Sequence, residues 1–420
     1  MSDTLEVLYT SDLSEQQWSC CAWDYKTATS LMVYKGGGAV NARCFCFVGN
    51  SHIISANSAK PLFHVWPINS QEQISSVRFV APGKANALAI SPDGNYLVAG
   101  IQETLYIWQI SSGRMLANLS KHYQAITCIK FTDDGSHFVS AGLDGGVLVW
   151  NLPQVICNGD HNQEPLYSFN DHGLSVTDVH IGSGGIRAYL YSVSLDRTCK
   201  IYDLSSGTLL LNIVFTESLS CVASNNLETS VHVGTTEGQI YEFYINSLPR
   251  TKEYHMTKEN VNKYLGHKGT VSCLALSVDG ETLVSGGEDA QVHLWHIPSK
   301  QLIRTLAHRG PISNVVLSLR KLSAFGPENT FLNMFTNNLK RMMDSADADE
   351  SHTIDVLVEE NDDDDEFDIT HQITNRSFVA GPAALGSNTE EVETLRQEIK
   401  KLKNINRKLF SISTKNILNS

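Results

Sequence analysis

Residues 140–150 read Ser140-Ala141-Gly142-Leu143-Asp144-Gly145-Gly146-Val147-Leu148-Val149-Trp150. The last four form a short apolar run that closes on an aromatic residue, and this feature recurs seven times. The closing aromatics are Trp23, Trp66, Trp108, Trp150, Tyr202, Phe243 and Trp295, at intervals of 43, 42, 42, 52, 41 and 52 residues. A period of about 40 residues is typical of repeat arrays built from small sheets. The sequence therefore predicts an all-β, seven-bladed propeller, which is usually a surface for partners rather than a catalyst.

The interval between successive aromatics holds a regular alternation of apolar runs and turns. In the third unit, residues 87–90 are apolar, residues 91–95 (Ser-Pro-Asp-Gly-Asn) form a turn, and residues 96–99 are a second apolar run. Proline presets φ and glycine accepts positive φ, so the chain can reverse between antiparallel strands. The apolar runs are only about four to six residues long, which favours strands over helices.

Three units also carry a set of four residues at matching offsets. The sets are His122, Ser140, Asp144 and Trp150; His172, Ser192, Asp196 and Tyr202; and His267, Ser285, Asp289 and Trp295. In each set the serine precedes the aromatic by 10 positions and the aspartate precedes it by 6. With Gly266-His267, Trp23-Asp24 and Tyr202-Asp203, this pattern resembles the WD40 repeat family over residues 5–319. The expected arrangement is a buried network in which Asp orients His, His bonds Ser, and Ser reaches the indole N–H.

The same Ser, His and Asp match the composition of a hydrolase triad, which would perform acyl transfer. Three copies at equal spacing favour architecture, because an enzyme needs one site and a satisfied buried network specifies one packing arrangement. The glycine-rich runs 36–38 and 182–185 lack phosphate-loop spacing, and there is no CxxC pair for zinc. We therefore predict no enzyme, and no catalytic, cofactor-binding or metal site.

Four units depart from the full pattern. The residues six positions before Trp66, Trp108 and Phe243 are Lys60, Gln102 and Glu237 instead of aspartate. We expect these three blades to rely on packing alone. The first unit has room for only about three strands, and the run 312–317 follows the last unit. We expect that run to supply the inner strand of blade one and so close the ring without an open edge.

Composition places the chain among soluble intracellular proteins. Nine cysteines at irregular spacing suggest reduced thiols, and the first residues lack the basic and apolar stretch of a signal peptide. A net charge of −13 argues against an anionic membrane and against non-specific nucleic-acid binding. We expect no membrane association and no direct sequence-specific contact with nucleic acid.

The repeat ends near residue 319, and the composition then changes. We expect residues 320–386 to be an acidic flexible linker, because Asp362-Asp363-Asp364-Asp365-Glu366 repels itself. Its function is open between a solubilising linker and a docking segment for a basic, ribosome-like surface. Short partner-binding pieces such as Phe331-Leu332-Asn333-Met334-Phe335 also fall within it.

Residues 387–418 predict a short C-terminal coiled-coil helix. Ser387-Asn388-Thr389-Glu390 reads as a capping box. The predicted interface positions follow at 3-4 spacing: Val392, Leu395, Ile399, Leu402, Asn406 and Leu409. Asparagine at one a position is typical of register-fixing two-stranded coils, so we expect self-association as a parallel dimer. The basic residues on its flank are either solvated, in contact with RNA or an acidic partner, or part of a weak nuclear-import signal.

The whole chain resembles the WD-repeat protein 18 family, in the blade-four run 119–124 with 136–140 and in the terminal run 402–410. That resemblance implies a non-catalytic scaffold subunit of a nuclear complex for large-ribosomal-subunit biogenesis, found in the nucleolus and nucleoplasm, with the cytoplasm left open. It implies a role in processing the second internal transcribed spacer and in remodelling the pre-60S particle with the AAA ATPase midasin. The implied partners are a helical-repeat scaffold protein rich in proline, glutamate and leucine, and a second helical-repeat subunit. A ubiquitin-ligase substrate adaptor and a chromatin or replication-factor scaffold remain alternatives.

Overall fold

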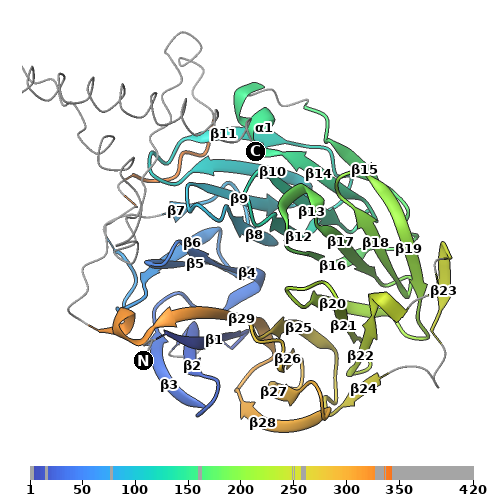
Figure 1. Cartoon of the computed structure of the whole chain (residues 1–420). Helices are drawn as coiled ribbons and strands as arrows, with labels where there is room; N and C mark the ends of the chain where they lie inside the picture. Colours follow the sequence, from blue (N-terminus) through green and yellow to red (C-terminus); the bar gives the residue numbers. More distant parts are fainter. Residues whose placement is uncertain are drawn as a thin grey trace, which may run out of the picture. The chain divides into compact units, whose positions relative to one another are not determined.

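The computed structural model describes residues 4–14, 18–75, 79–158, 163–247, 249, 251–256, 262–326, 335 and 337–342. Within these ranges the strands form seven sheets, which are arranged around a common centre as the blades of a propeller (Figure 1). The predicted seven-bladed, nearly all-β fold is therefore confirmed. The acidic run and the coiled-coil positions Val392, Leu395, Ile399, Leu402, Asn406 and Leu409 lie outside the described residues.

The first four blades follow the chain order of the aromatic repeats, with the innermost strand given first. Blade one contains β29 (Ile312–Lys321), β1 (Thr4–Asp12), β2 (Cys20–Asp24) and β3 (Thr29–Tyr34). Blade two contains β4 (Val40–Val48), β5 (His52–Asn57), β6 (Leu62–Pro67) and β7 (Phe79–Val80). Blade three contains β8 (Ala87–Ile90), β9 (Tyr96–Ile101), β10 (Thr104–Gln109) and β11 (Met115–Leu119). Blade four contains β12 (Ile126–Phe131), β13 (His137–Gly142), β14 (Val147–Asn151) and β15 (Tyr167–Phe169).

Blade five contains β16 (Val176–Ile181), β17 (Tyr189–Ser194), β18 (Thr198–Asp203), β19 (Thr208–Val214) and an added strand, β23 (Glu253–His255). Blade six contains β20 (Leu219–Ser224), β21 (Ser230–Thr235), β22 (Gln239–Tyr244) and β24 (Asn262–Leu265). Blade seven contains β25 (Val271–Leu276), β26 (Thr282–Gly287), β27 (Gln291–His296) and β28 (Gln301–Ala307). The described helices are α1 (Leu152–Asn158) and the short η1 (Gly185–Arg187), η2 (Ile245–Ser247) and η3 (Leu322–Phe325).

The closing aromatics pack the sheets against one another. Trp66, Trp108, Trp150 and Tyr202 are fully buried, each within an apolar cluster that joins residues of two neighbouring blades. Burying an aromatic side chain removes 150–250 Å² of surface, so a roughly 40-residue unit gains most of its stability from its neighbours. Among the described residues no helix is both long and apolar enough to cross a membrane.

Two insertions account for the two long intervals of 52 residues. The first, after Trp150, contains α1, which packs against β11 and β14. The second, between Phe243 and Trp295, contains β23, which pairs in parallel with β19 on the outer edge of blade five. This added strand covers an edge that would otherwise expose unpaired backbone groups.

The two ends of the ring meet in blade one. Strand β29 runs antiparallel to β1 in a register from Thr4 opposite Lys321 to Asp12 opposite Ile312. The pairing extends to Lys321 and is followed by η3, so the propeller does not end at residue 319 as the composition suggests. The boundary drawn at 319/320 is therefore too early, since β29 continues as a paired strand across it.

A second part of the expected flexible linker also packs on the propeller. Phe335 and Leu339 are buried in the apolar cluster between blades two and three. The Phe335 ring meets Phe79 edge-on, with ring centroids 5.3 Å apart. The Lys340 N–H donates to the Gly113 carbonyl at 2.8 Å, and the Trp108 indole N–H donates to the Lys340 carbonyl at 2.8 Å. At Phe335, the end of the expected partner-binding piece 331–335, this chain contacts its own core.

Candidate functional site

The tetrad of blade four is a continuous hydrogen-bond chain from one strand to the next. The Trp150 indole N–H donates to Ser140 Oγ at 3.0 Å, and Ser140 Oγ lies 2.9 Å from His122 Nε2. His122 Nδ1 lies 3.1 Å from Asp144 Oδ2. Since the indole can only donate, the serine hydroxyl donates to Nε2, and the Nδ1–H of the imidazole donates to the carboxylate. Each buried polar group of the set therefore has a partner.

Blade seven repeats this chain almost atom for atom. The Trp295 indole donates to Ser285 Oγ at 2.9 Å, Ser285 Oγ lies 2.7 Å from His267 Nε2, and His267 Nδ1 lies 3.1 Å from Asp289. Burial would raise the pKa of the Asp289 carboxyl, but hydrogen bonds from the Lys268 backbone and from His267 bring this pKa below its usual value. The carboxylate therefore stays ionised beside a neutral imidazole.

Blade five shows the consequence of replacing tryptophan by tyrosine. His172 Nε2 lies 2.6 Å from Ser192 Oγ, and its Nδ1 lies 3.0 Å from Asp196 Oδ2. The Tyr202 hydroxyl instead donates to Asp171 at 3.1 Å. The aromatic side chain thus stays buried, but its hydroxyl donates to an acceptor outside the four-residue set. The sequence offsets alone do not indicate this difference.

The accessibility of the serines decides against acyl transfer. Ser140, Ser192 and Ser285 are completely buried. A nucleophilic serine must be able to contact a substrate carbonyl, and these three hydroxyls are covered by packed strands. The described geometry therefore supports three structural networks rather than a hydrolase site.

In two blades that lack a tetrad, the indole N–H of the tryptophan donates to a backbone carbonyl. The Trp66 indole N–H donates to the Lys35 carbonyl at 2.8 Å, and the Trp108 indole donates to the carbonyl of Lys340. The expectation that these blades rely on packing alone is therefore wrong. A backbone carbonyl replaces the serine, and in blade three it comes from a segment more than 200 residues away.

Blade six, which has Phe243 and no indole, buries a different polar group. The Glu242 carboxylate is buried and accepts hydrogen bonds from the Tyr244 hydroxyl at 2.9 Å and the Tyr264 hydroxyl at 3.3 Å. His232 lies 3.7 Å from this carboxylate, and burial lowers the pKa of its imidazole to about 3. The imidazole is therefore neutral at physiological pH.

Blade one contains a group of buried polar residues that the sequence analysis missed. The Trp23 indole donates to Thr10 Oγ1 at 2.8 Å, and His308 Nδ1 lies 3.9 Å from Asp12 Oδ2. These residues stand at tetrad-like positions at the two ends of the chain, but 3.9 Å is too long for a hydrogen bond. Among the described residues, both ring nitrogens of His308 and Asp12 Oδ2 have no hydrogen-bond partner. One signal could have found it. His122, His172 and His267 each precede their inner strand by four positions, and His308 precedes Ile312 by the same distance.

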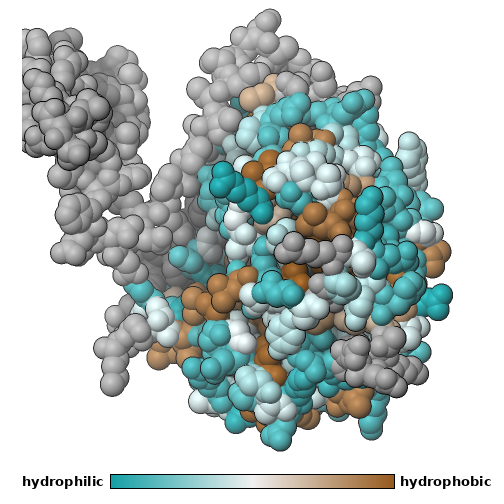
Figure 2. Space-filling view, turned by 45° about the vertical axis from the view of Figure 1, so that its right-hand side comes forward, coloured by the Kyte–Doolittle hydropathy of each residue, from teal (hydrophilic) through white to brown (hydrophobic). Residues whose placement is uncertain are grey.

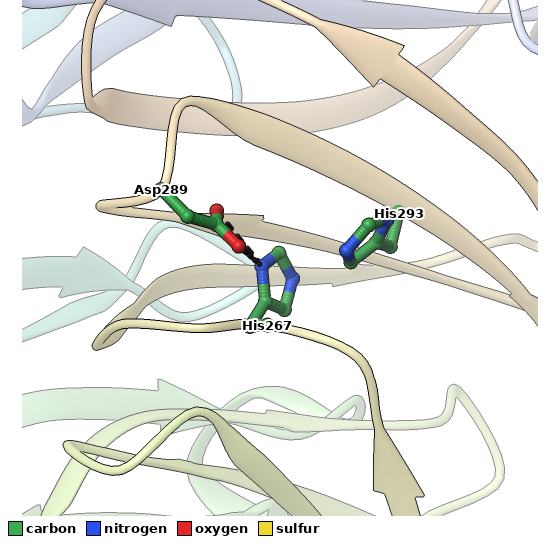
Figure 3. A group of neighbouring side chains, drawn as sticks. All are labelled: His267, Asp289 and His293. Carbon is green, nitrogen blue, oxygen red and sulfur yellow. Dashed lines mark hydrogen bonds and ion pairs between the residues drawn. The ribbon is translucent and has the colours of Figure 1, made fainter.

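One group of described side chains has donor atoms that could approach a metal ion. These atoms, on His267, Asp289 and His293, lie within 4.8 Å of one another (Figure 3). Both nitrogens of His267 are engaged in the tetrad, and His293 Nδ1 lies 3.0 Å from Thr305 Oγ1. Burial and the neighbouring His267 lower the pKa of His293 to about 4. A metal would have to break the tetrad, so the arrangement fits a structural role.

The comparisons with known proteins agree with this geometry. The family model for the WD domain, G-beta repeat, matches residues 113–151, 163–203 and 258–296, which are the three units with full tetrads. WD repeat-containing protein 18 of Danio rerio is 32% identical to the chain, and the alignment covers 99% of this chain and 98% of that protein. This chain belongs to the WD repeat-containing protein 18 family.

The chain is also similar to two further proteins. The Homo sapiens member is 31% identical over 99% of this chain and 98% of its own length. Pre-rRNA-processing protein IPI3 of Yarrowia lipolytica is 29% identical, with 84% of each chain covered. Members of the WD40 class are generally non-catalytic scaffolds, in agreement with the buried serines.

Proposed function

We propose that this chain is a non-catalytic scaffold subunit of a nuclear complex that matures the large ribosomal subunit. The observation that carries this proposal is the likeness, over 84% of both chains, to a protein named for pre-rRNA processing. The structure supports a scaffold, because the candidate chemical groups of the described propeller are buried in structural networks. A propeller offers its loops to protein partners while the sheets stay rigid.

The finer part of the proposal concerns the step and the partners. We place the complex in processing of the second internal transcribed spacer and in remodelling of the pre-60S particle with midasin. Its other subunits are a helical-repeat scaffold protein rich in proline, glutamate and leucine, and a second helical-repeat protein. The subunit acts in the nucleolus and nucleoplasm. This part rests on the family resemblance.

Sedimentation of nuclear extract tests the proposal directly. The tagged full-length protein is followed on a sucrose gradient with and without RNase. We expect it to co-migrate with large-subunit precursors and to leave those fractions after RNase treatment. Migration only in small complexes that RNase does not change would refute the ribosomal role and favour an adaptor or chromatin scaffold.

The mechanism that we propose for the C-terminal helix is avidity. Two propellers joined by one coil would present paired surfaces to a two-fold partner, which raises the effective concentration of the second contact. Changing Leu395→Asp together with Leu402→Asp places charges in the predicted seam, so we expect a monomer by light scattering and weaker complex assembly. Gln397→Asp with Asn404→Asp adds the same charge at predicted outward positions and should leave a dimer. A dimer that survives the seam changes would contradict the coil.

A further inference from the structure

Four large apolar side chains are exposed on the loops at one end of blades four and five. They are Tyr123, 93% exposed; Leu174, 56%; Leu143, 46%; and Leu195, 38%. Figure 2 brings the blade-five side of the ring forward, and apolar residues gather in patches among hydrophilic ones there. Single exposed apolar residues are ordinary, whereas a group on adjoining loops marks an interaction surface.

Backbone contacts show that the four loops adjoin. Within blade four, the Leu143 N–H donates to the Ala125 carbonyl at 2.9 Å, which places the Leu143 loop beside the Tyr123 loop. A Cβ on Gly145 would lie 3.1 Å from the Leu174 carbonyl oxygen, so the blade-four and blade-five loops touch. Within blade five, Ser194 Oγ donates to that same carbonyl at 3.1 Å, one residue before Leu195. We call these four residues the loop patch.

Equivalent loops of blades four, five and seven can be compared to decide whether the exposed apolar residues are needed for the loops to fold. Leu143, Leu195 and Glu288 occupy one structural position, because each donates its N–H to the loop that follows its tetrad histidine, at 2.9, 3.2 and 2.9 Å. Tyr123 and Lys268 likewise match, since each donates its N–H to the tetrad aspartate, at 2.9 and 3.1 Å. Blade seven therefore builds the same loops with exposed charged residues. The apolar side chains of blades four and five are not needed for the loop fold.

The charges around the loop patch indicate what it can bind. Carboxylates on the same and the two flanking loops are Glu103, Asp144, Asp171, Asp196 and Glu217, against Lys121 and Arg197. Burial alone would raise the pKa of Asp144 and Asp196, but hydrogen bonds from the tetrad histidines and backbone bring these pKa values below normal. Both carboxylates therefore stay ionised, and the acidic rim repels acidic segments of a partner. Opposite charge at a rim steers binding and sets specificity.

We propose that the loop patch is a docking site for a short peptide segment of a partner protein, with leucine-like side chains flanked by lysine or arginine. The apolar side chains of that segment cover Tyr123, Leu143, Leu174 and Leu195, and its cations face the carboxylate rim. The inference stands apart from the proposed ribosomal role, since it rests on the loops of blades four and five and on the two loops that flank them.

A selection from random peptides tests both the site and the chemistry. A phage-displayed 12-residue peptide library is selected on the full-length protein, and enriched peptides are synthesised for fluorescence anisotropy. The test variant combines Leu143→Glu and Leu195→Glu, which copy the residue at position 288 and should leave the melting temperature unchanged. The control is Leu227→Glu, because Leu227 is 81% exposed and precedes β21, at the other end of the strands from the loop patch.

We expect the enriched peptides to combine apolar residues with an excess of Lys and Arg. They should bind the wild type and the Leu227→Glu protein equally, and bind the Leu143→Glu, Leu195→Glu protein at least tenfold more weakly. Binding should also weaken as salt rises. Peptides that do not distinguish the double variant, or no enrichment at all, would overturn the site. Enrichment of peptides without Lys or Arg would overturn the proposed peptide chemistry. Self-association that is lost only in the double variant would overturn the partner peptide as occupant, because the patch would then be a contact between two copies of this chain.

Discussion

Arg43 joins blades that are not neighbours in the ring, and its removal is the most informative single change. It lies on β4, and its Nε donates to Asp178 Oδ1 on β16 at 3.0 Å. Its Nη2 donates to the Ser220 carbonyl on β20, also at 3.0 Å. The inner strands follow the order β29, β4, β8, β12, β16, β20 and β25, so this side chain ties blade two to blades five and six across the centre.

The cost of losing this contact follows from its burial. The side chains of Arg43 and Asp178 are 25% and 13% exposed, so solvent screens the pair only in part. Removing one partner of a fully buried ion pair costs about 3–5 kcal/mol. With the residual exposure we expect Arg43→Ala to lower the free energy of unfolding by about 2 kcal/mol. At about 2.1 cal/mol/K per residue, a cooperative ring of roughly 320 residues would then melt about 3 °C lower.

The backbone at Arg43 adds a second, independent expectation. Its φ is +55°, a left-handed conformation that favours glycine, and it lies where the register of β4 shifts between Val40 and Phe45. Arg43→Gly removes the same side chain but relieves the backbone, so it should be about 1 kcal/mol more stable than Arg43→Ala.

Urea unfolding of Arg43→Ala, Asp178→Asn and the double variant completes the test. The amide introduced by Asp178→Asn keeps an oxygen that can accept from the Val222 N–H, which lies 3.1 Å from Asp178 Oδ2 in the unaltered chain. We expect the sum of the two single-variant losses in unfolding free energy to exceed the loss in the double variant by at least about 1 kcal/mol. Such a difference is typical of residues in direct contact. Strictly additive losses would show that the cross-ring pair contributes no coupling, and the reasoning would then be refuted.

Three further predictions use the same unfolding assay. Asp289→Asn removes the charge that orients His267, so we expect a loss of about 1–3 kcal/mol, and an unchanged midpoint would contradict a structural tetrad. Phe335→Ala leaves a cavity between blades two and three and should cost about 3–4 kcal/mol; a loss under about 1 kcal/mol would show that the segment does not support the ring. Burial lowers the pKa of His232 to about 3 and of His293 to about 4. The unfolded state therefore binds more protons below pH 6.5, so stability should fall as pH drops from about 6.5 towards 4, and His232→Leu should flatten that slope.

The sequence could predict those contacts whose residues all lie within one repeat unit. In the three tetrads the serine and the aspartate precede the aromatic by constant offsets, and the histidine precedes the serine by 18 or 20 positions. Periodicity alone therefore brings His122 near Ser140 and His267 near Ser285. The group around His308 has its histidine and its tryptophan nearly 300 positions apart, and an offset search within one unit cannot connect them. It becomes visible only once the strand 312–321 is assigned to blade one.

Other contacts had no sequence signal at all. The carbonyls of Lys35 and Lys340 accept from Trp66 and Trp108, and every residue carries a carbonyl, so no residue type indicates the partner. Likewise Arg43 adopts a positive φ that its residue type disfavours, and only the contacts across the ring explain it.

These differences divide the ring into two classes of blade. Blades four, five and seven orient their aromatic through groups within about 30 residues, so their loops are specified locally. Blade three depends on the segment around Phe335 and Lys340, and blade one depends on β29, so both need the chain beyond residue 311. A truncated chain that ends near 311 should therefore lose the support of blades one and three first. The loop patch lies on blades four and five, where the loops are fixed by their own tetrads, so a rigid scaffold presents its exposed leucines independently of the C-terminal segments.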